Sequence, residues 1–346
     1  MRKEGVFLID VLSALDVSAG RLYSGIMHTS EVLHNHVSIL YLDHHMLVVN
    51  KPAGIVVHPT YKHTSGDTLW DALLVDARLR EDNWQPAVLP DEPEWAGAPA
   101  HIQEMLREQR RARLVKEEGL LPQPCLLHRL DKDTSGVLAL ARTERARQYI
   151  ARQFNTHTLE KRYLAVVQRG APSWAMPRVS LEITRSHAGA VITRQEKSLL
   201  FDEIGNDEVE MSGPLQRDPG DRRRCIVGPE GQRAVTRVRV LAQYDGLTLL
   251  EVQPVTGRTH QIRAHLAAYG YGIVGDQVYG QDTISGTVTS QLRRQFLHAY
   301  SLTLRCYPDG IIRTFVAPLA DDLMEWMRHY FSIGAGVIDA RAVPAQ

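Results

Sequence analysis

Apolar residues in this chain are concentrated in short runs bounded by turn residues, a pattern typical of strands. Val137 to Ala141 is an unbroken apolar run, as expected for a buried strand. Residues 234–240 alternate arginines with apolar side chains, as a half-exposed strand would. The same pattern predicts three further strands, at 247–252, 302–304 and 314–316.

Helical spacing of apolar residues is clear at only two places. The first runs from His101 to Glu118, and the second, 259–269, is entered through the turn at Thr256 and Gly257. Short strands therefore outnumber helices, and we expect an α+β fold.

Composition narrows the class of protein without naming a function. With 346 residues, of which 44% are hydrophobic, the chain can bury a substantial core in one large or two smaller domains. No apolar run approaches the roughly 18 residues that cross a bilayer, and no signal-peptide core follows Met1, so we expect a cytoplasmic protein with no membrane segment. A net charge of zero argues against nonspecific polyelectrolyte binding. No interface motif is found, and a monomer is expected.

Motifs for cofactors and metals are missing from the sequence. It has no phosphate-binding Walker loop and no dinucleotide glycine fingerprint, so we expect no cofactor. The three cysteines are far apart, without a Cys-x-x-Cys pair, and we interpret them as reduced packing residues. His28, His34 and His36 are close in sequence but lack metal-ligand spacing, so no metal site is expected there.

The segment from His128 to Gly136 carries the most specific chemistry. It places Asp131 between two cations in a turn, directly ahead of the apolar run at 137–141. Polar side chains at 133–135 can bond to neighbouring backbone, and Gly136 permits a positive φ, so the loop can be rigid without crowding Asp131. A rigid, uncrowded carboxylate suits catalysis. A solvated surface acid is the alternative interpretation.

This segment resembles the signature of the RluA-type pseudouridine synthases, and other matches follow in the family's order over most of residues 39 to 327. They are similar to the family's opening strands and Lys-Pro turn, its tyrosine motif, its basic hairpin, its arginine motif with a continuation, and its closing strands: 39–59, 161–167, 214–227, 256–266, 273–280, 295–300 and 317–319.

The resemblance implies the pseudouridine synthase fold, a largely antiparallel mixed β-sheet with flanking helices and a central RNA-binding cleft. It also implies an isomerase that converts uridine in structured RNA, either 23S-type rRNA or tRNA, to pseudouridine. The base leaves C1′ through N1 and reattaches through C5, a reaction that needs no cofactor or metal.

Three residues match the family's catalytic positions. Asp131 matches its aspartate, which could abstract the C2′ proton to give a glycal or attack C1′ directly; the sequence leaves both routes open. Arg263 matches the arginine that pairs with this acid and favours its charged form. Tyr163 matches a tyrosine whose ring can stack on a flipped uracil. The plainer alternatives are a surface arginine on a helix and a core tyrosine on a strand.

Further residues of the same motifs are predicted to bind the RNA substrate: His128, Arg129, Thr134, Arg258 and His260. Arg129 can fill the gap left by a flipped base with its planar cation. For Arg258 and His260, phosphate binding and support of the turn both remain open.

The chain divides into an N-terminal extension, 1–37, a catalytic domain, 38–330, and a C-terminal tail, 331–346. The extension shows no match to the S4 RNA-binding module of some family members, which weakly favours a tRNA-modifying or dual-specific relative. Two insertions are predicted within the domain. In the first, 77–121, the helix has an apolar side and a basic side, so it either tracks phosphates or is merely solvated. The second, 172–212, turns acidic and is expected to face away from RNA.

Two other functions remain open from the sequence. A noncatalytic RNA-binding or ribosome-assembly protein could share the fold, but it would not need Asp131, Tyr163 and Arg263 together. A hydrolase would ordinarily need a second carboxylate, for which Asp133 is the nearest candidate in sequence, and it would release free uracil.

Overall fold

The computed structural model describes residues 32–33, 37–57, 68–75, 79, 84, 95, 97–175, 181–187, 190–196, 201, 207–280 and 292–331. Most of the predicted N-terminal extension, with His28, His34 and His36, and nearly all of the predicted tail lie outside these residues.

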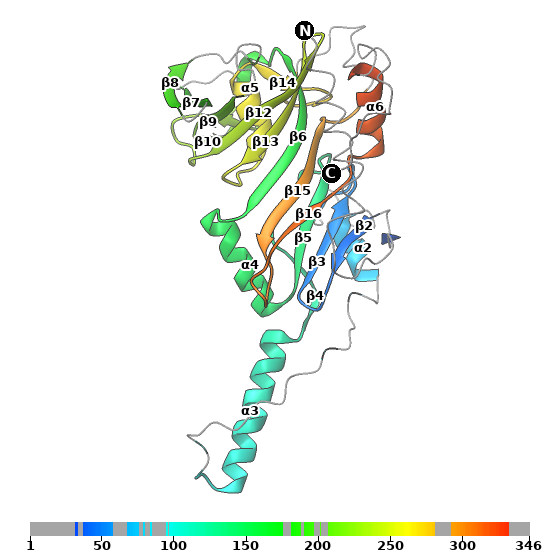
Figure 1. Ribbon diagram of the computed structural model, residues 1–346, viewed down its shortest axis with the longest axis vertical. Helices are drawn as coiled ribbons and strands as arrows, with labels where there is room; N and C mark the ends of the chain where they lie inside the picture. The colour runs from blue at the N-terminus through cyan, green and yellow to red at the C-terminus, as the bar shows by residue number, and fades with distance from the viewer. Residues whose placement is uncertain are drawn as a thin grey trace, which may run out of the picture.

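One large mixed sheet forms the centre of the molecule (Figure 1). Its strands lie in the order β1-β2-β3-β5-β15-β6-β13-β12-β9-β7-β8, while β4 pairs with β5, β14 with β6 and β16 with β15. Of the strand pairs in the described residues, only β5 and β15 run parallel. This confirms the predicted α+β fold with a largely antiparallel mixed sheet. The strands are β1 Val32–Leu33, β2 Val37–Leu42, β3 Met46–Lys51, β4 Leu120–Leu126, β5 Ser135–Thr143, β6 Glu160–Arg169, β7 Leu181–His187, β8 Ala190–Glu196, β9 Glu208–Ser212, β12 Val235–Tyr244, β13 Leu247–Pro254, β14 Tyr271–Ile273, β15 Leu297–Arg305 and β16 Ile312–Val316.

The apolar runs predicted as strands form the middle of this sheet. The run at 137–141 becomes β5, in which every residue is buried because β3 and β15 flank it and helices cover it. The ranges 234–240 and 247–252 form the antiparallel hairpin β12-β13, and 302–304 and 314–316 form the pair β15-β16. Alternation and apolar runs were therefore reliable signals here.

The second predicted insertion continues the sheet. Within 172–212, the strands β7, β8 and β9 extend the edge beyond β12, preceded by the short 3-10 helix η4, Ser173–Ala175. Glu210 on β9 accepts a 2.9 Å hydrogen bond from Arg237 on β12, so cross-strand arginine neutralises part of the acidic charge. That this segment faces away from RNA stays a prediction.

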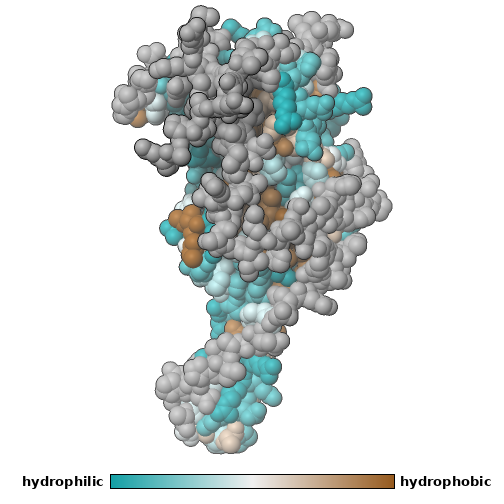
Figure 2. All heavy atoms as spheres, turned by 45° about the vertical axis from the view of Figure 1, so that its right-hand side comes forward, coloured by the Kyte–Doolittle hydropathy of each residue, from teal (hydrophilic) through white to brown (hydrophobic). Residues whose placement is uncertain are grey.

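The helix of the first insertion, α3, spans Ala100–Glu118, which confirms the predicted range almost to the residue. It projects from the sheet as an arm (Figure 1) whose visible surface is largely hydrophilic (Figure 2). The apolar side expected to anchor it is incomplete, because Met105 is 44% exposed. At its root, Glu117 pairs with Arg145 at 2.5 Å and the carboxylate of Glu118 accepts from the Tyr307 hydroxyl at 2.6 Å. These contacts fix the direction of the arm.

The described residues contain four more α-helices, which pack beside the sheet: α2 Leu69–Val75, α4 Glu144–Thr156, α5 Gln261–Ala268 and α6 Asp321–Phe331. A small hairpin, β10 Leu215–Arg217 and β11 Cys225–Val227, carries the predicted basic loop. Every residue of α5 is buried. No helix in the described part of the chain is both long and apolar enough to cross a membrane.

Candidate active site

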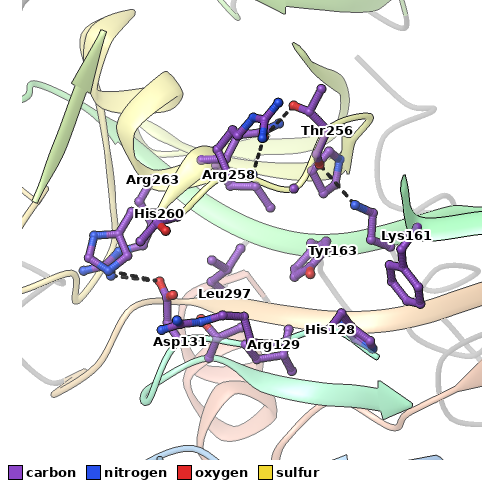
Figure 3. A pocket seen from close by; sticks show the side chains of 18 of the residues that line it. His128, Arg129, Asp131, Lys161, Tyr163, Thr256, Arg258, His260, Arg263 and Leu297 are labelled. Atoms are coloured by element: carbon purple, nitrogen blue, oxygen red, sulfur yellow. Dashed lines mark hydrogen bonds and ion pairs between the residues drawn. The ribbon is translucent and has the colours of Figure 1, made fainter. Parts of the chain in front are cut away.

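A cavity of about 400 Å³ lies between β6, the loop before β5, the end of α4 and the start of α5 (Figure 3). All of the residues predicted for the site line it: Asp131, Tyr163, Arg263, His128, Arg129, Thr134, Arg258 and His260. They come from three segments far apart in sequence, so the fold gathers every motif into one pocket.

A buried lysine holds the loop that carries Asp131. Lys51 is fully buried, and its ammonium donates to the carbonyl oxygens of Pro52, Ile55 and Lys132 at 2.8, 2.9 and 2.9 Å. Three carbonyl acceptors replace the water that a buried cation loses. Lys51 therefore ties the Lys-Pro turn to the residue next to Asp131.

A second set of bonds fixes the other side of this loop. Arg294 forms a two-pronged pair with Asp322 of α6 at 2.6 and 2.7 Å and donates to the carbonyl of Asp133 at 3.1 Å. The Thr134 hydroxyl accepts from the side chain of Gln295 at 3.2 Å, and Thr134 is only 2% exposed. Thr134 thus supports the loop, and its predicted substrate contact stays a prediction.

Gly136 is required where the loop enters β5. Its φ is +118°, and a Cβ there would lie 2.1 Å from the carbonyl oxygen of Ala299 on β15. The glycine lets β5 and β15 approach as parallel neighbours. The positive φ expected at Gly136 is thus confirmed, and it sets the direction in which the chain leaves the loop and enters β5.

Asp131 and Arg263 form the central ion pair of the pocket. Nη1 of Arg263 donates to Oδ2 of Asp131 at 3.0 Å (Figure 3). Arg263 is 6% exposed, which excludes the alternative of a surface arginine on a helix. A guanidinium at this distance stabilises negative charge on the carboxylate and orients it.

Arg263 is itself held by Asp276, a residue for which the sequence motif suggested no role. Its Nε and Nη2 donate to the two oxygens of Asp276 at 2.7 and 2.8 Å, and the Asp276 side chain is fully buried. The backbone N–H groups of Val278 and Tyr279 also donate to Asp276, each at 2.9 Å. Because Asp276 binds Nε and Nη2 of the guanidinium, Nη1 remains for Asp131.

Tyr163 belongs to both the core and the pocket. It lies on β6, opposite Val252 of β13 and Ala299 of β15, and is 9% exposed. Burial, followed by the charge of Asp131, raises the pKa of its hydroxyl, which stays protonated. Its position in the pocket lining permits the predicted stacking role.

His128 and Arg129 are neighbours with different surroundings. Nε2 of His128 accepts from the backbone N–H of Ala139 at 3.0 Å, and its ring stacks on Phe154. Burial, followed by Lys161, lowers the pKa of His128 to about 3, so the imidazole is neutral. His128 therefore fastens the loop to β5. Arg129 is exposed at the pocket and has no hydrogen-bond partner within the described ranges, which leaves its guanidinium available.

The turn ahead of α5 is organised by Gln261. Its side-chain oxygen accepts from the Thr256 hydroxyl at 2.6 Å and from the backbone N–H of Arg258 at 3.0 Å. The side chain of Arg258 is exposed and donates to the Arg233 carbonyl at 3.3 Å. His260 has a φ of +53° and lies with Nε2 3.9 Å from Oδ2 of Asp131.

The sequence did not single out Lys161 as a pocket residue. Its ammonium donates to the Thr256 carbonyl at 3.1 Å, and burial lowers its pKa to about 8. Its place two residues before Tyr163 was a usable signal, because alternate strand residues share a face.

Acidic residues are scarce around this cavity. Asp131 is the only carboxylate among the described residues that line it, while Asp133 lies outside the lining. A two-carboxylate hydrolase therefore has no second acid here.

Comparison with known proteins identifies the family. The model of a family described as RNA pseudouridylate synthase matches residues 45–268. This chain belongs to that family. The ribosomal large subunit pseudouridine synthase D of Nitrosomonas europaea is 30% identical over 90% of this chain and 69% of its own length. An uncharacterized RNA pseudouridine synthase of Chloroflexus aurantiacus is 35% identical over 81% of this chain and 65% of its own length.

Membership of this family makes the protein an RNA pseudouridine synthase, an isomerase that acts on uridine in RNA. A human protein, RNA Pseudouridylate Synthase Domain Containing 4, aligns over 84% of this chain and 91% of its own, with 23% identity and a TM-score of 0.47.

Proposed function

We propose that this protein isomerises a uridine of structured RNA with Asp131 as the catalytic carboxylate. The observation that carries the proposal is the contact of Asp131 with Arg263 at 3.0 Å in a pocket that Tyr163 also lines. A noncatalytic RNA-binding protein would have no need for this partly buried ion pair, whose arginine is also held by Asp276.

Each side chain has a role in this reaction. The target nucleotide flips out of its stack into the cavity, where the ring of Tyr163 offers the uracil a new stacking surface. Arg129, exposed at the mouth, holds the flipped nucleotide or fills the space it leaves. Asp131 then abstracts the C2′ proton or attacks C1′, the N1 bond to the sugar breaks, and the base returns through C5. Arg263 keeps the carboxylate aimed in either route.

We infer large-subunit ribosomal RNA as the first substrate to test. The Nitrosomonas europaea relative is named for the ribosomal large subunit, and this chain spans about two thirds of the length of the curated relatives it matches. Transfer RNA is the second substrate to test.

The arm α3 supplies a contact to RNA beyond the pocket. Arg111 and Lys116 are exposed on it, and a helix of 19 residues reaches about 28 Å. Cations on an arm of fixed direction can meet phosphates away from the flipped base, which adds affinity without entering the chemistry.

The test is tritium release from C5-tritiated uridine in total ribosomal RNA and, separately, in total transfer RNA, together with chromatography for free uracil. We expect release from ribosomal RNA with no free uracil. Free uracil would establish hydrolysis. RNA binding without release from either pool would favour a noncatalytic protein.

A further inference from the structure

A buried tyrosine favours one tautomer of His260. Tyr279 is fully buried, and its hydroxyl accepts from the backbone N–H of Cys225 at 2.6 Å. Its other partner is Nδ1 of His260 at 3.0 Å. The Cys225 N–H can only donate, and among the described residues Nδ1 is the only acceptor within reach of the hydroxyl proton of Tyr279, so the hydroxyl donates to Nδ1. Nδ1 is therefore unprotonated, and the ring proton is on Nε2.

The surroundings of His260 keep the imidazole neutral. Burial lowers its pKa, and the cations Arg263 and Arg217 act in the same direction, while the carboxylates Asp131 and Asp276 oppose them. With one proton on Nε2 and none on Nδ1, His260 is a neutral hydrogen-bond donor.

This donor faces the pocket beside the catalytic carboxylate. Nε2 is 3.9 Å from Oδ2 of Asp131, beyond the length of a hydrogen bond. An oxygen atom can lie about 2.8 Å from both atoms at once. Only a group that accepts from Nε2–H and donates to the carboxylate satisfies both, and a hydroxyl does so.

We propose that His260 and Asp131 together bind the ribose 2′-hydroxyl of the target uridine, with Tyr279 as the positioning residue that keeps the Nε2 proton in place. The proposal rests on the function proposed above, which puts the sugar of the flipped nucleotide next to Asp131. It makes His260 the residue by which the enzyme distinguishes ribose from deoxyribose at that nucleotide, because the 2′-hydroxyl is both donor and acceptor.

A single hydroxyl on the substrate provides the test. A hairpin RNA carrying the uridine located by tritium release is prepared with either uridine or 2′-deoxyuridine at that position only. The ratio of kcat/KM for the two RNAs is measured with wild-type enzyme and with His260→Gln, His260→Ala and Tyr279→Phe. Glutamine retains an amide N–H near the place of Nε2, and alanine retains none. Arg258→Ala is the matched control, since it changes a pocket residue away from the hydroxyl.

We expect the wild-type enzyme to prefer the ribose substrate and His260→Ala to lose roughly tenfold of that preference, the effect of one hydrogen bond. His260→Gln retains most of the preference. Tyr279→Phe loses part of it, because the ring proton is then free to move to Nδ1. Arg258→Ala lowers both rates together, as structural damage would.

Three results would overturn the inference. The first is equal kcat/KM of the wild-type enzyme for the ribose and deoxyribose RNAs. The second is a kcat/KM ratio in His260→Ala equal to that of the wild-type enzyme, and the third is the same result in Tyr279→Phe. Equilibrium binding of the two RNAs gives the same comparison for any variant too slow to follow. Failure of the proposed function would look different, since wild-type enzyme would then release no tritium from the ribose substrate.

Discussion

Replacing Asp276 by asparagine tests whether the Asp131 site depends on a buried support. Asp276→Asn removes the charge that faces two nitrogens of Arg263 at 2.7 and 2.8 Å, on a side chain with no exposure. Breaking a buried pair from one side costs about 3 to 5 kcal/mol, since the remaining charge stays buried. Arg263 keeps its contact with Asp131 at 3.0 Å, so we expect the lower end, about 3 kcal/mol.

The matched control is the same change at an exposed pair. Asp309 also meets an arginine, Arg313, with two oxygens at 3.2 and 2.7 Å, but both side chains reach solvent, at 36% and 28% exposed. Asp309→Asn leaves no buried charge and should therefore cost about 1 kcal/mol or less.

Urea unfolding followed by far-UV circular dichroism measures both free energies, and equal m-values make the comparison valid. Tritium release by Asp276→Asn should also fall, because a loosened Arg263 no longer aims Asp131. Equal losses of stability in the two variants would mean that burial of the Arg263–Asp276 pair does not set its contribution to stability.

Further predictions concern the base, the pocket cation and the arm. Tyr163→Leu should lower kcat/KM roughly 5- to 150-fold, since stacking on an aromatic ring contributes about 1 to 3 kcal/mol, while Tyr163→Phe keeps most activity. Lys161 is charged below its pKa of about 8, so RNA affinity measured by filter binding should weaken as pH rises from 7 to 9, and Lys161→Met should remove that step. Replacing Arg111 and Lys116 by glutamine should weaken RNA binding and leave the single-turnover rate unchanged. The slope of log affinity against log salt concentration should fall in magnitude by about 0.7 to 0.9 for each phosphate that the arm no longer neutralises. An unchanged slope would count against binding of RNA by the arm.

The sequence predicted the elements that depend on local pattern. The apolar run at 137–141 could only be buried between neighbours, and the helical spacing at 101–118 reproduced α3. The strands within 172–212 were not predicted, because their sequence alone does not distinguish short strands at a sheet edge from an inserted loop. Their pairing depends on β12, which lies later in the chain. Met105 shows the same limit, since an apolar side of a helix does not reveal whether anything covers it.

The site shows a similar division. Asp131, Tyr163 and Arg263 were predicted from motifs, and the fold brings them to one pocket. The supports were not predictable, because contacts such as Arg263 with Asp276, or Lys51 with the carbonyl of Lys132, join distant segments and depend on tertiary geometry. Burial also decided the charge state of His128, which local sequence does not encode.

The most direct test of the central claim is the single-turnover rate of Asp131→Asn on an RNA that wild-type enzyme modifies. Arg263 keeps its two-pronged pair with Asp276 in this variant, so stability and RNA affinity should stay close to the wild-type values. We expect tritium release at background level with RNA still bound. A folded Asp131→Asn enzyme that modified RNA within about tenfold of the wild-type rate, a loss of no more than one hydrogen bond, would contradict the assignment of Asp131 as the catalytic carboxylate.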